Sequence, residues 1–109
     1  MIIRVDIDGT ICTNRDELQK TNLNASYKDA TPYIDRIKIV NELYDNGEYI
    51  IYWTGRGAIS KVDYFELTKQ QLKEWGAKYH LLEVANKPHF DMYICDKSFN
   101  ADTWFKEYK

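Results

Sequence analysis

Two patterns of apolar residues alternate along the chain and predict its strands and helices. Short runs rich in β-branched and aromatic residues are typical of strands, whereas apolar residues repeated every three or four positions are typical of helices. The predicted strands cover residues 2–7, 49–53, 79–84 and 92–95. The predicted helices cover residues 31–46, 60–76 and 101–108, and the mostly polar residues 11–31 form a loop with room for one short helical turn.

Residues with strong preferences for helix ends set these boundaries. Thr31-Pro32 predicts the start of the first long helix, with threonine at the cap and proline at the first helical position. Asn46-Gly47 predicts its end. Ser60, followed by Asp63 three positions later, resembles a capping pair for the second helix, which Gly76 closes.

The order of these elements predicts the fold class. Strand, helix, strand, helix, strand, strand and helix are typical of an α/β fold whose mostly parallel sheet has right-handed crossovers. Residues 1–109 contain no repeat and no linker, which predicts one domain. Ligands of such folds bind at the carboxyl ends of the strands, so polar residues at those ends are the candidate site residues.

Charge and cysteine content exclude several classes of protein. Fifteen Lys and Arg residues against seventeen Asp and Glu residues give a net charge of −2, so no nucleic acid partner is expected. The apolar runs are too short for a signal peptide or a membrane span. Cys12 and Cys95 have no metal-ligand spacing and predict no disulfide framework. We therefore expect a cytoplasmic protein without a membrane partner.

Acidic residues at two predicted strand ends suggest a metal site. Asp6 and Asp8 lie at the end of the first strand, where two like charges are costly unless a cation lies beside them. Carboxylate oxygens are the ligands that suit Mg²⁺, which also binds the phosphate groups of substrates. Asp96 follows the last predicted strand and is placed to complete the site.

The residue types at the strand ends also match the needs of phosphoryl transfer. Asp6 is the candidate nucleophile, and Asp8 the candidate acid that protonates the leaving group and then activates water. The Thr54 hydroxyl and the Gly55 amide offer hydrogen bonds to phosphoryl oxygens. Lys87 offers a positive charge to the phosphate and to Asp6.

Four short motifs resemble those of one family. The run Asp6-Ile7-Asp8-Gly9-Thr10 is similar to the D-x-D-G-T signature of the haloacid dehalogenase superfamily of phosphatases. Tyr52-Trp53-Thr54-Gly55 resembles the second motif of that superfamily, Lys87-Pro88 the third, and residues 91–96 the acidic fourth. The motifs occur in the order of the superfamily and span almost the whole chain.

The resemblance implies a three-layer Rossmann-like fold and a Mg²⁺-dependent phosphatase. By it, Asp6 accepts the phosphoryl group and binds the metal, Asp8 is the acid and base and binds the metal through its backbone carbonyl, and Asp96 is the distal ligand. Thr54 and Lys87 would bind the phosphoryl group. The residues of the second, third and fourth motifs are similar to those of small proteins of this superfamily associated with polysaccharide and capsule biosynthesis.

Two departures from the relatives concern the metal site. Cys95 precedes Asp96 where those relatives often carry a second acidic residue, which puts Mg²⁺ affinity in question. Some relatives also have a further aspartate four or five positions on, where this chain has Asn100 and Ala101. Asp102 follows at a different spacing.

The gaps between the motifs leave no room for a cap domain. Residues 11–31 make at most a flap, and one helix and one strand fill the gap between Thr54 and Lys87. An uncapped site admits bulky substrates, or a second subunit of a homo-oligomer covers it. The negative net charge argues against nucleic acid and leaves a small phosphorylated substrate or a phosphoprotein. The likeness to the polysaccharide-associated proteins favours a sugar phosphate or a glycan precursor.

Other functions and other roles for single residues remain open from sequence. A phosphoacceptor signalling domain also clusters acids, a threonine and a lysine at strand ends, and a binding protein with a decayed metal site would explain Cys95. Arg56 is interpreted equally well as a contact to substrate anions and as a solvated side chain. The neighbouring acids are expected to raise the pKa of the thiols of Cys12 and Cys95.

Overall fold

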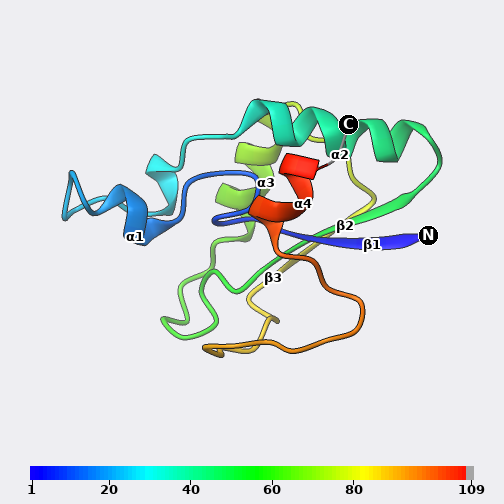
Figure 1. The fold of residues 1–109 in the computed structure, drawn as a ribbon. Coiled ribbons are helices and arrows are strands. Elements are labelled where there is room, and N and C mark those ends of the chain that lie inside the picture. Colours follow the sequence, from blue (N-terminus) through cyan, green and yellow to red (C-terminus); the bar gives the residue numbers. More distant parts are fainter. Residues whose placement is uncertain (108–109) are drawn as a thin grey trace.

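Strands and helices alternate through residues 1–107, the part of the chain that the computed structural model describes (Figure 1). The elements are β1 (Ile2–Asp6), α1 (Arg15–Leu18), the 3₁₀ turn η1 (Tyr27–Asp29), α2 (Ile34–Asp45), β2 (Tyr49–Thr54), α3 (Phe65–Glu74), β3 (Leu81–Val84) and α4 (Ala101–Glu107). No helix in residues 1–107 has both the length and the apolar character needed to cross a membrane.

The three strands form one parallel sheet in the order β1-β2-β3. Asp6 of β1 pairs with Trp53 of β2, which in turn pairs with Glu83 of β3. The carboxyl ends of all three strands therefore lie along the same edge of the sheet. The predicted α/β class and the parallel sheet are confirmed.

The core lies where β2 is covered by its neighbours. Ile50 and Tyr52 on one face of β2 are fully buried, and Ile51 on the other face is 6% exposed. This explains the apolar run at the centre of β2, since the middle of a strand with a neighbour at each edge and cover on both faces has no solvent-facing position. Ile37 and Val40 of α2 pack into the same core.

The first long helix begins later than its sequence signal predicts. Pro32 forms a β-bridge with Cys12, and the backbone and hydroxyl of Thr13 hydrogen-bond to the backbone of Thr31 at 2.9 Å each. These contacts hold residues 31–32 in an extended conformation, so α2 begins at Ile34. The predicted helix start at Thr31-Pro32 is wrong, because a pairing with a distant segment competes with the local cap.

The second predicted capping pair is also wrong. The Ser60 hydroxyl accepts a hydrogen bond from the Val62 amide in the loop before α3. The Asp63 carboxylate accepts one from the Phe65 amide at 2.9 Å, and α3 begins only there. Asp63 thus serves the helix start alone, while Ser60 stabilises the preceding turn.

The predicted fourth strand does not form among the described residues. Residues 92–95 pair with no strand, and Met92 and Ile94 are 76% and 88% exposed. Figure 1 shows the segment between β3 and α4 as a long loop that runs away from α2. A short apolar run becomes a strand only when a neighbouring strand satisfies its backbone, which this segment lacks. The final helix is described to Glu107, and its predicted end at Tyr108 lies outside the described residues.

Candidate functional site

A cavity of about 250 Å³ opens at the carboxyl ends of the strands. Its lining includes six of the seven predicted site residues and a rim of mostly apolar side chains. The lining residues are Asp6, Asp8, Tyr27, Thr54, Gly55, Arg56, Ala58, Ile59, Lys87, Pro88, His89 and Phe90. The structure thus brings together all of the predicted site residues except Asp96.

Asp6 ends β1 and faces the cavity with part of its carboxylate exposed. Its Oδ1 accepts a hydrogen bond from Lys87 Nζ at 2.8 Å, and its Oδ2 accepts one from the Thr10 hydroxyl at 3.3 Å. The Asp6 side chain is 37% exposed and the Lys87 side chain 21%. Asp6 is therefore both ion-paired and accessible to a small molecule in the cavity.

Aromatic rings flank the ammonium group of Lys87. Lys87 Nζ lies 5.1 Å from the ring centroid of Trp53 and 5.8 Å from that of Phe90. Cation–π attraction to these rings adds to the ion pair with Asp6. These contacts hold the ammonium group of Lys87 at the cavity, although Lys87 lies three residues after the end of β3.

Asp8 has a different cationic partner. Arg56 Nε donates to Asp8 Oδ2 at 2.9 Å, and Arg56 Nη2 donates to Asp8 Oδ1 at 2.8 Å. The Arg56 side chain is fully buried, and that of Asp8 is 19% exposed. The interpretation of Arg56 as a solvated side chain is wrong, because its guanidinium lies in the interior beside a carboxylate.

Thr54 connects the Asp8 carboxylate with the backbone of Arg56. Its hydroxyl donates to Asp8 Oδ2 at 3.4 Å and accepts a hydrogen bond from the Arg56 amide at 3.2 Å. Thr54 is 2% exposed and ends β2, and Gly55 follows it at the cavity wall. The Thr54 hydroxyl thus orients Asp8 in this structure.

Sequence analysis missed the residues that surround Arg56. Thr68 and Gln71 of α3 are both buried and both accept hydrogen bonds from Arg56 Nη1. Tyr27, from the predicted flap, lies with its ring centroid 4.8 Å from the guanidinium carbon. One sequence signal could have identified them: Thr68 and Gln71 are polar but lie on the same face of the predicted helix as the apolar Leu72.

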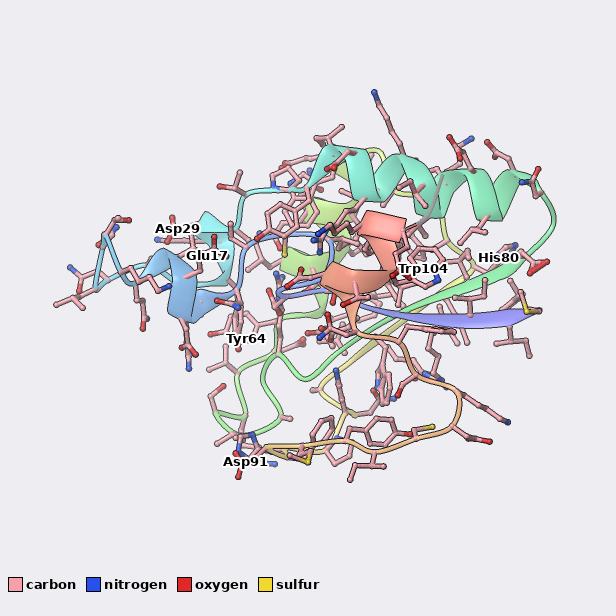
Figure 2. The ribbon with its side chains drawn as sticks, in the orientation of Figure 1. Glu17, Asp29, Tyr64, His80, Asp91 and Trp104 are labelled. Atoms are coloured by element: carbon pink, nitrogen blue, oxygen red, sulfur yellow. The ribbon has the colours of Figure 1, made fainter. Side chains whose placement is uncertain are left out.

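The predicted metal ligands do not come together in this structure. Asp96 is exposed and does not line the cavity. Figure 2 shows Asp91, which begins the fourth motif, on the outer loop away from α2. Within residues 1–107 no group of three or more His, Cys, Asp or Glu side chains lies close enough to hold a metal ion. Lys87 and Arg56 neutralise Asp6 and Asp8 instead.

The two cysteines differ in their surroundings. Burial, followed by the negative charge of Asp8, raises the pKa of the Cys12 thiol to about 12. Hydrogen bonds from the Tyr93 hydroxyl and the Lys97 amide lower the pKa of the Cys95 thiol. The expectation of a raised thiol pKa is therefore confirmed for Cys12 and wrong for Cys95.

Comparisons with known proteins establish a likeness of fold. No protein-family model matches the chain, and no curated protein matches it in sequence. The chain is similar in structure to a Vibrio cholerae protein whose crystal structure was solved as an MCSG target. The TM-score is 0.78 at 20% sequence identity, over 100% of this chain and 90% of that chain. At this identity the likeness concerns the fold alone.

Proposed function

We propose that the chain is a phosphomonoester hydrolase that uses Asp6 as the phosphoryl acceptor. The observation that carries the proposal is the convergence of Asp6, Asp8, Thr54 and Lys87 from three neighbouring strand ends onto one cavity. The likeness of the chain to the motifs of the haloacid dehalogenase superfamily supports a three-layer Rossmann-like fold of the uncapped type. The three parallel strands are compatible with that fold.

The first half of the reaction transfers the phosphoryl group to Asp6. A carboxylate oxygen of Asp6 forms a bond to phosphorus while the bond from phosphorus to the leaving oxygen breaks. Asp8 takes up a proton from solvent before this step and donates it to the leaving oxygen, which departs as an alcohol. Lys87, already 2.8 Å from Asp6, neutralises the phosphoryl oxygens during the transfer.

The second half regenerates Asp6. Asp8, now a carboxylate, accepts a proton from a water molecule as the water oxygen bonds to phosphorus. The bond from phosphorus to the Asp6 oxygen breaks, which releases inorganic phosphate. The exposures agree with this division of roles, because Asp6 is 37% exposed and open to attack, whereas Asp8 is 19% exposed and held by neighbours.

Mg²⁺ is the cofactor that the motifs imply, and it would neutralise the phosphoryl oxygens. Asp6, Asp8 and Asp96 are the residues that the resemblance assigns to it. They do not fit a metal ion as arranged here, since Asp96 lies outside the cavity and the Asp6 carboxylate has the Lys87 ammonium group as its partner. Added Mg²⁺ is therefore a variable of the assay rather than a participant in the steps above.

The rim of the cavity supports a sugar phosphate or glycan precursor as substrate. Tyr27, Ile59 and Phe90 offer apolar surface beside the polar floor. Sugar rings pack their C–H faces on such side chains while their phosphate group reaches the charged residues. Ile59 is 71% exposed, so the rim also leaves room for a bulky leaving group or for a second subunit in a homo-oligomer.

Release of phosphate from a substrate panel tests the proposal. Sugar phosphates, nucleotides and phosphopeptides are assayed with and without Mg²⁺, using the wild type, Asp6→Asn and the control Asp45→Asn. Asp45 forms a surface ion pair with Lys78 outside the cavity, so this control keeps activity. Asp6→Asn is expected to remove turnover while retaining the wild-type fold by circular dichroism. Activity retained in folded Asp6→Asn contradicts the assignment of the nucleophile.

Two further measurements distinguish a phosphatase from a signalling domain and from a binding protein. A phosphorylated form that survives for hours, measured after treatment with a small phosphodonor, favours a phosphoacceptor signalling domain. Absence of turnover, together with absence of Mg²⁺ binding in isothermal titration, favours a binding protein with a decayed site.

A further inference from the structure

The guanidinium group of Arg56 is a buried charge with a complete set of protein partners. Nε and Nη2 bind the two oxygens of Asp8 at 2.9 and 2.8 Å. Nη1 donates to the Thr68 hydroxyl at 3.2 Å and to the side-chain carbonyl oxygen of Gln71. A buried arginine is tolerated only when such acceptors satisfy it.

A second layer of contacts fixes these partners in turn. Gln71 Nε2 donates to the backbone carbonyl of Tyr27 at 2.7 Å, and the Tyr27 ring lies 4.8 Å from the Arg56 guanidinium carbon. Tyr27 also packs edge-on against Tyr64, before α3, at 4.9 Å between ring centroids. Arg56 is thereby held between α3 and the flap, and it cannot turn without breaking several contacts.

The fork geometry restricts Asp8 in the same way. Two parallel hydrogen bonds from one planar guanidinium fix both oxygens of a carboxylate, so the carboxylate cannot rotate about its Cβ–Cγ bond. The Thr54 hydroxyl, 3.4 Å from Asp8 Oδ2, adds a third restraint. Asp8 therefore presents its remaining lone pairs to the cavity in one fixed direction.

We propose that Arg56 is a positioning residue that aims Asp8 at the leaving oxygen, and that it does not bind the substrate itself. The proposal rests on the proposed phosphatase function. Arg56 lines the cavity, but each nitrogen of its guanidinium already donates to a protein acceptor. A substrate anion would have to displace Asp8 to reach it.

This role predicts a dependence on the leaving group. An alkyl leaving group needs a proton from Asp8, so a misdirected Asp8 slows its departure. A 2,4-dinitrophenolate leaving group departs without a proton and does not need Asp8 in the first step. The value of kcat/KM reports the steps up to transfer onto Asp6, so it isolates this difference.

Steady-state kinetics of Arg56→Gln and Arg56→Lys with an alkyl phosphate and with 2,4-dinitrophenyl phosphate tests the proposal. Arg56→Gln is expected to lower kcat/KM about 100-fold for the alkyl ester, a loss of the size that misplaced catalytic groups cause, and to change it little for the activated ester. Arg56→Lys keeps the charge but loses the fork, and it is expected to restore only part of the rate. Arg4→Gln, which removes a similar forked pair with Glu83 outside the cavity, is the matched control with wild-type kinetics.

A double variant separates positioning from substrate binding and guards against misfolding. Arg56→Gln alone leaves Asp8 without its partner, whereas Asp8→Asn with Arg56→Gln leaves a neutral pair. If Arg56 acts only through Asp8, the double variant is as active on the alkyl ester as Asp8→Asn alone. A double variant slower than Asp8→Asn, or an equal loss for both esters in folded Arg56→Gln, overturns the proposal while the phosphatase function stands. A wild type inactive on both esters overturns the phosphatase function, and this proposal with it.

Discussion

Asp6 and Asp8 lie two positions apart, yet their carboxylates have cationic partners of different character. Lys87 is a point charge on a flexible stem, 21% exposed, and able to follow a phosphoryl group that arrives beside Asp6. Arg56 is a planar fork with a fully buried side chain, so its geometry is fixed. In the proposed mechanism, the nucleophile Asp6 is thus paired with the more exposed, flexible cation and the proton-transfer group Asp8 with the buried, fixed one.

The two thiols give a prediction at the same scale. A thiol reagent such as 5,5′-dithiobis(2-nitrobenzoate) at pH 7.5 is expected to modify Cys95 rapidly and Cys12 only after unfolding. The thiolate is the reactive form, and the pKa of Cys12 is raised to about 12 by burial while that of Cys95 is lowered by hydrogen bonds. One rapid equivalent in buffer, two in urea and none in folded Cys95→Ser confirm this, whereas rapid labelling of Cys12 in the folded protein contradicts it.

Half of the residues that line the cavity were predicted as site residues, because they lie at or just after the carboxyl end of a strand in a parallel sheet. Asp6, Asp8, Thr54 and Lys87 needed only the order of the strands to be placed at one edge. The partner of Asp8 was not predictable, since Arg56 lies 48 positions away and the sequence does not specify which way its side chain turns. The predicted position of Asp96 was wrong because it depended on a strand that does not form among the described residues.

At the scale of elements, local signals failed where another segment or a preceding turn used the same polar groups. The Thr31-Pro32 signal marks a helix start, but residues 12–13 pair with it and delay α2 to Ile34. The centres of α2, α3 and β2 were predicted correctly, because burial of a long apolar stripe or run outweighs any single cap. Element ends, by contrast, depend on one or two hydrogen bonds.

The loop after β2 depends on one glycine, which gives a prediction. Gly57 has φ +83°, and a Cβ atom there would lie 2.1 Å from the carbonyl oxygen of Val62. Gly57→Ala is therefore expected to lower the free energy of unfolding by more than the 1–2 kcal/mol or so that a left-handed alanine costs. Urea denaturation followed by tryptophan fluorescence measures this loss.

Gly47→Ala is the matched control for this loop. Gly47 also has a positive φ, +95°, but nothing lies within 4 Å of a Cβ atom there. Its substitution carries the backbone cost without the collision, so the difference between the two variants measures the collision itself. Equal losses in the two variants would mean that the loop after β2 relaxes freely.

At the scale of the whole molecule, stability depends on protons that the folded chain retains at alkaline pH. The ordinary pKa of Cys12 is 9.0, and burial raises it to about 12. Burial also raises the pKa of Tyr52, whose hydroxyl is buried and has no hydrogen-bond partner among the described residues. Above pH 9 the unfolded chain releases these protons first, so the folded state loses stability as the pH rises.

Urea denaturation between pH 7.5 and 11 tests this dependence. The free energy of unfolding is expected to fall by about 1.4 kcal/mol per pH unit for each such proton. Cys12→Ala is expected to flatten the fall that begins near pH 9, and Tyr52→Phe the fall that begins near pH 10. If the free energy of unfolding of both variants falls with pH as steeply as that of the wild type, the loss of stability at alkaline pH comes from other groups.

If the chain is the proposed phosphatase, the pairing of each acid in the cavity with a base also affects how a phosphate ester reaches the cavity. With both aspartates ionised, one lysine and one arginine balance them, so the acidic and strongly basic side chains of the cavity then sum to zero charge. The whole chain carries −2. A dianionic ester therefore meets no attractive field at long range, and its encounter rate is set by diffusion and orientation and changes little with ionic strength. Discrimination among anions begins only at contact, when a phosphate competes with Asp6 for Lys87.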